Sequence, residues 1–269
     1  MRNFCVRVTQ SSKPAAIIQA LVFLCLIGLI AVPTVSADVK DDYNAKIAAG
    51  LSPEEAAKEV AAERFAANED PVEVANMIAT AAVESAIARG IDVAEAVQMA
   101  SAGITKGVIE SAAASGQSQE AIAAVVQAAS QGIAKGALSA AVTAGQDVAA
   151  VTSAAAAGTT QGAVEGAVAT GQNAAALAQN AAQGAAQGAN DAAVATGQDV
   201  NTINQAAKKG TLDGAKAGAE NSGENVGRMT SAANAGTNNI TPTPTETTVT
   251  AEETTEETTT SVEATTTVW

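Results

Sequence analysis

A glycine recurs at every thirteenth position along most of this chain. Twelve glycines between Gly90 and Gly236 form the series, and ten of their eleven intervals follow this 13-residue spacing. The exception is the 16-residue interval between Gly116 and Gly132. A strict short repeat predicts a stack of similar structural units, and it disfavours an irregular globule with an active-site cleft.

The length of the period limits the kind of unit. An ideal helix turns about 100° per residue, so a feature at every thirteenth position would drift around a continuous helix and mark no single face. We therefore expect each unit to be a helix of about ten residues that ends at a glycine in the left-handed conformation.

Two kinds of unit alternate. The first kind opens with an Asp or Asn suited to capping a helix N-terminus, namely Asp92, Asp147, Asn173, Asp199 and Asn225. The second kind has glycine at its fourth position, namely Gly107, Gly136, Gly162, Gly188 and Gly214. Two successive units would form a 26-residue antiparallel helical hairpin. The sequence thus predicts an all-α, α-solenoid-like array of short helices.

A second interpretation joins each pair of units into one long helix. The second kind of unit has weak start signals, since Ala185-Ala186 offers no cap. Each 26-residue repeat would then form one helix of about 24 residues that runs through a glycine such as Gly158 or Gly184. Gly158, Gly162 and Gly166 would line one face that another backbone can approach closely. In that case Gly158→Ala is expected to stabilise the helix.

The N-terminal residues 1–37 have the pattern of a secretory signal peptide, with a basic start, an apolar stretch and the small-residue site Val35-Ser36-Ala37. A retained membrane anchor is the alternative, which the short apolar stretch disfavours. Cleavage after Ala37 removes both cysteines, Cys5 and Cys25, so the exported chain can form no disulfide. It leaves 11 basic against 28 acidic side chains, a net charge of −17.

Three further segments are distinguished by composition. Residues 38–77 lack the 13-residue spacing and are expected to form an N-terminal helical cap, with helix starts at Ser52-Pro53 and Asp70-Pro71. Residues 78–239 hold the Ala/Gly-rich array, in which the 16-residue interval predicts a lengthened turn at residues 117–119, capped by Ser118. Residues 240–269 include fourteen Thr, six Glu and no basic residue, which predicts a disordered tail.

The sequence offers no catalytic, cofactor-binding or metal-binding residues. It contains no His, and no Cys remains after the predicted cleavage, so the usual general base, thiol nucleophile and zinc ligands are missing. The paired carboxylates Asp41-Asp42 and Glu54-Glu55 lie where acidic residues favour helix starts. No enzymatic activity and no cofactor are expected.

The expected function is therefore that of an exported, non-enzymatic structural or interaction protein, extracellular, on the cell surface or periplasmic. Its partner would be a second copy of itself, through self-assembly, or another extracellular or envelope protein. The acidic charge disfavours nucleic acid, and the polar helices disfavour membrane insertion. The alternatives are a membrane-active glycine-zipper protein and an ice-binding protein, the latter suggested by Thr159, Thr160, Thr170, Thr196 and Thr211.

Overall fold

The computed structural model describes residues 35–239, which form nine helices and no strand. The helices are α2 (Val35–Ala48), α3 (Pro53–Ala66), α4 (Pro71–Arg89), α5 (Val93–Ala114), α6 (Gln119–Thr143), α7 (Val148–Thr170), α8 (Ala174–Thr196), α9 (Val200–Ser222) and α10 (Val226–Asn238). The prediction of an all-α fold is confirmed for this part of the chain. The predicted signal peptide as far as residue 34, and the predicted tail from residue 240, lie outside the described residues.

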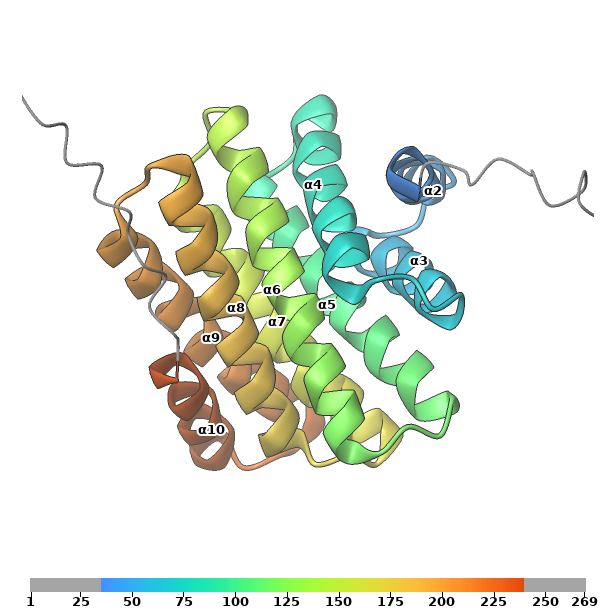
Figure 1. Ribbon diagram of the computed structural model, residues 1–269, viewed down its shortest axis with the longest axis vertical. Helices are drawn as coiled ribbons and strands as arrows, with labels where there is room; N and C mark the ends of the chain where they lie inside the picture. Colours follow the sequence, from blue (N-terminus) through green and yellow to red (C-terminus); the bar gives the residue numbers. More distant parts are fainter. Residues whose placement is uncertain (1–34, 240–269) are drawn as a thin grey trace, which may run out of the picture.

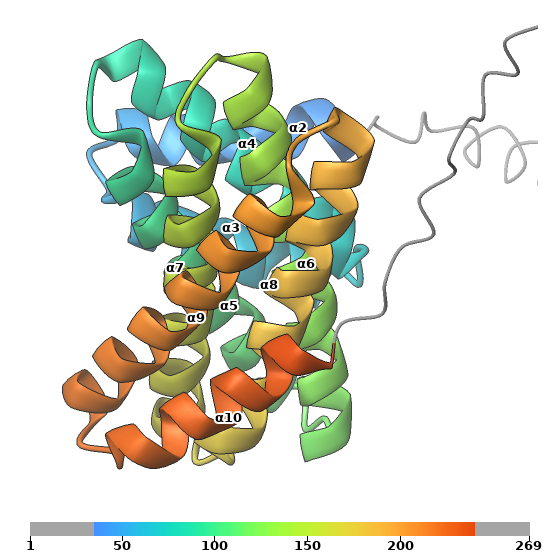
Figure 2. The same ribbon diagram turned by 90° about the vertical axis from the view of Figure 1, so that its left-hand side faces the viewer.

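From α3 onward, each helix packs side by side with the helix two places later in the chain, and this packing produces two layers. One layer contains α3, α5, α7 and α9, and the other contains α4, α6, α8 and α10. Figure 1 shows α4, α6 and α8 in front of the first layer, and Figure 2 looks onto the end formed by α9 and α10. At the other end α2 packs against α3 and α4 through Val39, Tyr43 and Ile47, all C-terminal to the predicted cleavage site.

The predicted N-terminal caps are confirmed. The capping Asp or Asn before each of α5, α7, α8, α9 and α10 accepts a hydrogen bond from the backbone amide at the third position after it, as Asp147 does from Ala150 at 3.0 Å. Asp70 before α4 accepts instead from the second position, Val72, at 2.8 Å. Ser118 caps α6 in the same way, and Ser52 forms a reciprocal capping box with Glu55 before α3. These short-range bonds satisfy backbone amides that a helix leaves free at its start.

Alternate glycines of the series end helices. Gly90, Gly116, Gly145, Gly171, Gly197 and Gly223 all have φ between 64° and 70°. After α7 the amide of Gln172 donates to the carbonyl oxygen of Ala167 at 2.8 Å, and the amide of Gly171 donates to that of Val168 at 3.2 Å. This pair of bonds closes the helix around a left-handed residue, the conformation that glycine adopts without strain.

The prediction of ten-residue helices is wrong, and the interpretation with one long helix per 26-residue repeat is correct. The remaining glycines of the series lie inside helices, so that α7, α8 and α9 each contain 23 residues. Each 26-residue repeat therefore forms one helix with its turn. An antiparallel hairpin requires two such repeats. Glycine in a helix interior costs about 1 kcal/mol relative to Ala, so these residues need a compensating contact.

That contact is the backbone of the preceding helix in the same layer. A Cβ atom on Gly162 would lie 2.5 Å from the carbonyl oxygen of Ala102 in α5, and one on Gly158 would lie still closer to that of Gln98. The same relation holds in the second layer, where Gly184 of α8 meets Gln127 of α6. Only a residue without a side chain allows this approach, which lets the backbones gain dispersion and Cα–H···O contacts.

The expected lengthened turn at 117–119 is also wrong, although its cap is correct. The turn Gly116-Gln117-Ser118 has the same length as Gly145-Gln146-Asp147 before α7. The three additional residues lie instead within α6, which has 25 residues. Three residues make almost one helical turn, so the insertion keeps the later residues of α6 close to their original faces.

Candidate functional site

A ladder of charged and polar side chains crosses the first layer on its outer side, and we call it the charged ridge. It contains Glu54 of α3, Lys106 of α5, Glu165 of α7 and Asn221 of α9. Lys106 forms ion pairs with Glu54, at 2.5 Å, and with Glu165. Asn221 donates to Glu165 at 2.8 Å. The ridge thus joins helices that are far apart in the sequence.

The central pair of this ridge is half-buried, and its charges stabilise each other. Burial acts to lower the pKa of Lys106, but hydrogen bonds and charges from Glu165 and Glu54 outweigh it and raise that pKa. Burial acts to raise the pKa of Glu165, but hydrogen bonds from Lys106, Asn221 and Gln161 lower it. Both groups are therefore charged at neutral pH, and neither is poised for proton transfer.

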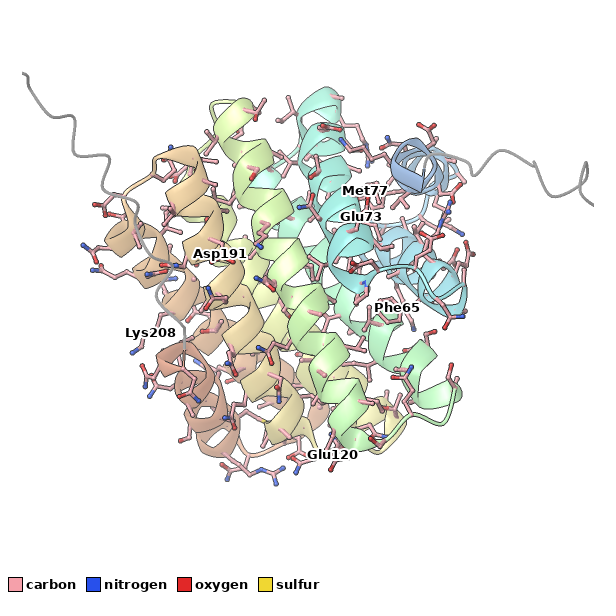
Figure 3. All side chains as sticks on the ribbon, in the orientation of Figure 1. Phe65, Glu73, Met77, Glu120, Asp191 and Lys208 are labelled. Carbon is pink, nitrogen blue, oxygen red and sulfur yellow. The ribbon has the colours of Figure 1, made fainter. Side chains whose placement is uncertain are left out.

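The second layer carries a ridge of amides. Its glutamines lie at four-residue spacing on two neighbouring helices, with Gln127 and Gln131 on α6 and Gln179, Gln183 and Gln187 on α8. Asp191 closes this amide ridge, since it accepts from Gln131 at 3.0 Å and from Gln187 at 2.7 Å and lies 3.3 Å from Lys135. Figure 3 shows Asp191 on the outer side of α8.

Shallow depressions lie between neighbouring helices within residues 35–239. One of about 230 Å³ lies beside Glu54 and Gln98, and one of about 300 Å³ lies beside Asn76, Lys135 and Asp191. A third of about 200 Å³ lies among α8, α9 and α10. Within residues 35–239 no group of three or more acidic, His or Cys side chains is placed to hold a metal ion.

The paired carboxylates identified in the sequence do not come together as a site. Glu54 belongs to the charged ridge, and Glu55 is held in the capping box by Ser52. Asp42 pairs with Arg64 of α3. Glu55 thus supports the start of its own helix, whereas Glu54 and Asp42 pair with cations on other helices.

The threonines that suggested an ice-binding surface are mostly interior. Thr159, Thr160 and Thr211 are fully buried. Their hydroxyls donate to carbonyl oxygens of the preceding turn in the same helix, as Thr159 does to Ala155 at 2.7 Å. These three residues cannot contribute to an outer surface.

The end of the stack at α9 and α10 differs from its interior, which sequence reasoning missed. Residues separated by two 26-residue repeats occupy equivalent places in α7 and α9, as do Gly158 and Gly210. At such places the buried Thr152 and Ala156 of α7 are replaced in α9 by Asn204 and by the exposed Lys208. Figure 3 shows Lys208 at the outer edge of the molecule. A comparison of every second 26-residue repeat would have revealed this change.

Amides also replace core residues around this end. Asn190 of α8 stands where α6 has the fully buried Leu138, and the amide of Asn204 donates to Asn190 at 3.3 Å. The third depression lies here and is lined by Ala186, Asn201, Asn204, Gln205, Lys208 and Thr237. This end thus carries amide and charged side chains at places where the inner helices have Thr, Ala or Leu.

No family model matches this chain, and no curated protein matches it at a significant level. None of the helices within residues 35–239 combines the length and apolar character needed to cross a membrane. Arguments about function therefore rest on the two ridges, the depressions and the polar end.

Proposed function

We propose that this chain is an exported, non-enzymatic interaction or structural protein, built as an α-solenoid-like stack that presents two long polar faces to a protein partner. The observation that carries this proposal is the combination of the two ridges with glycine packing beneath them. Close backbone contact fixes the spacing of the helices, so the charged ridge and the amide ridge are held at regular intervals. Regular polar surfaces of this kind suit extended contact with another chain.

The shallow depressions support binding of a macromolecule in preference to a small molecule. Small-molecule sites enclose most of their ligand and are lined mainly by apolar side chains. Here the depressions beside Glu54 and Lys135 are bordered by charged and amide groups. The partner would be a second copy or another extracellular or envelope protein, and the acidic charge disfavours nucleic acid.

Self-assembly by adding one stack to the end of another has less support. Addition of that kind would need apolar or glycine-bearing helices at both ends, and α9 carries Lys208 and Lys209 where α7 has Ala156 and Ala157. The glycine-zipper alternative also loses its basis, because the glycines on which it depends already pack against this chain's own backbone.

Photo-crosslinking from the two ridges tests the proposal. A photoreactive amino acid would replace Gln131 on the amide ridge or Gln161 beside the charged ridge, in the full chain expressed in its own host. The exposed turn residue Gln117 provides the matched control. We expect one discrete crosslinked protein, identified by mass spectrometry, from at least one ridge and not from Gln117.

Fractionation of the same cells tests export. We expect the chain outside the cytoplasm and shortened by the predicted 37-residue signal peptide. A full-length cytoplasmic chain would contradict export. Equal, diffuse crosslinking from all three positions would contradict a specific partner surface.

A further inference from the structure

The polar end of the stack is left partly uncovered by its last helix. α10 has 13 residues, whereas α8, on which it packs, has 23. Gly236 of α10 packs against Gln179 in the first turns of α8, and the later residue Ala186 lines the open depression. Ala186 is itself buried, like the equivalent Ala134 in α6. Helix α10 is thus too short to cover the second half of α8, and we call the part of α8 and α9 around this depression the vacant strip.

The strip has polar groups whose interactions are incomplete. The side-chain oxygen Oδ1 of Asn204 is buried and accepts no hydrogen bond, so a donor is missing at that point. Lys208, on the rim, forms no ion pair within residues 35–239, whereas the exposed Lys209 and Lys216 pair with Asp213 and Glu220 of the same helix. Residues 200–239 hold four basic against three acidic side chains, although the whole chain has a net charge of −14. A fitting ligand would supply hydroxyl or amide donors together with carboxylates.

The chain itself supplies those groups immediately beyond α10. Helix α10 ends at Asn238, and Thr237 lines the depression. The following residues 241–269 contain fourteen Thr, six Glu and no basic residue. The first of these carboxylates belongs to Glu246, and an extended chain covers about 3.3 Å per residue, or about 23 Å from Asn239. This reach suffices to bring the carboxylate of Glu246 to Lys208, which lines the same depression as Thr237.

We propose that residues 240–257 of this chain dock on the vacant strip of α8 and α9, with Thr hydroxyls and Glu carboxylates meeting Asn204 and Lys208. The composition of the segment prevents it from forming a core of its own, so the contact is polar and depends on charge. Tethering beside the site gives an effective concentration in the millimolar range, which favours a weak contact within one chain. The docked segment covers the end of the stack, separately from the two ridges.

A nitroxide spin label on the segment tests this proposal. The predicted mature chain, residues 38–269, contains no cysteine, so Thr250→Cys provides a single attachment point. This chain retains the buried side chains Val39, Tyr43 and Ile47 through which α2 packs. We expect the label to broaden the amide NMR signals of Asn201, Asn204 and Lys208 more than those of α3. Uniform broadening, or broadening only near residue 239, would overturn the proposal.

Three comparisons separate the possible origins of such broadening. Lys208→Glu/Lys209→Glu/Lys216→Glu should abolish the specific broadening, whereas Lys40→Glu/Lys58→Glu/Lys135→Glu, with the same change in charge, should retain it. In the labelled chain that keeps all its lysines, the broadened signals should recover in ~1 M NaCl, where the Debye length is about 3 Å. Broadening that persists at this salt concentration would overturn the role of charge. Labelled chains mixed with isotope-enriched unlabelled chains should show no broadening. Broadening in the mixture would mean that a second copy supplies the segment, which would overturn docking within one chain.

Discussion

Substitution of the interior glycines by Ala is the most direct test of how the helices are held together. A Cβ atom at Gly162 would lie 2.5 Å from the carbonyl oxygen of Ala102 and 2.9 Å from its Cα atom. Ordinary van der Waals contact with such a Cβ atom begins at 3.4 Å, so α7 must move away from α5 by half an ångström or more. A gap of that size loses a quarter to a half of the dispersion energy of the atoms that separate.

The expected free-energy change is the difference of two opposing effects. Overpacking costs about 1 to 3 kcal/mol, and replacement of an interior helical glycine by Ala gains about 1 kcal/mol. We expect Gly162→Ala to lower the free energy of unfolding by up to about 2 kcal/mol, and Gly158→Ala to lower it more. The sequence alone suggested that one long helix would make Gly158→Ala stabilising, and the structure reverses that expected sign.

Two other glycines serve as matched controls. Gly227 in α10 has only the side-chain oxygen of Asn225 nearby, at 3.3 Å, so Gly227→Ala should be neutral or slightly stabilising. At Gly166 the nearest atom is the flexible end of Ile109, at 3.1 Å, so Gly166→Ala should fall between them. Denaturant unfolding of residues 38–269, followed by circular dichroism, gives the order. The reasoning is refuted if Gly162→Ala is as stable as Gly227→Ala.

Three further predictions concern α2, the charged ridge and the layers. Burial raises the pKa of Tyr43 to about 12, against the weaker opposing effect of Arg89. Because Tyr43 is the chain's one tyrosine, the absorbance of tyrosinate near 295 nm should rise with a midpoint near that pH. A midpoint near 10 would mean that α2 does not pack against the other helices. The lowered pKa of Glu165 contributes stability above about pH 4.5 that is lost on acidification, so Glu165→Gln should destabilise the protein at pH 7 but not near pH 3 in urea unfolding. Deletion of residues 146–197 removes two helices with their turns, so it should preserve the layers and give cooperative unfolding. Deletion of residues 172–197 removes one helix and moves α9 into the other layer, so this variant should fold worse. Equal stability of the two variants would contradict the layered packing.

Local chemistry explains which parts of the fold could be predicted from sequence. A cap such as Asp147 bonds to Ala150 within the first turn of its own helix, so its pattern is complete in a short stretch of sequence. The same holds for the left-handed Gly171, which follows the last apolar turn of α7 and precedes a new cap. These local signals predict the start of every described helix from α3 onward without any knowledge of packing.

The choice between short and long helices depended on contacts that are distant in sequence. Gly158 and Gly171 both follow alanine-rich helical stretches, and each could end a helix by its own conformational freedom. What separates them is that Gly158 meets the backbone of Gln98, two helices earlier in the chain, whereas nothing lies within 4 Å of a Cβ on Gly171. The local indication within a repeat is the weak start signal that follows such an interior glycine, as Ala185-Ala186 does after Gly184.

Glycine contacts also explain how the array tolerates its irregular interval. Gly158 packs on Gln98, which lies 60 positions before it, whereas Gly184 packs on Gln127, which lies 57 positions before it. The difference equals the three additional residues of α6, which must therefore lie before Gln127. Because they are added before the residues that receive Gly184, the contacts further along the chain keep the separation of 57 positions, as for Gly210 on Ser153. The register of the stack is thus set by where glycine meets backbone, and lengths between those points can vary by a helical turn.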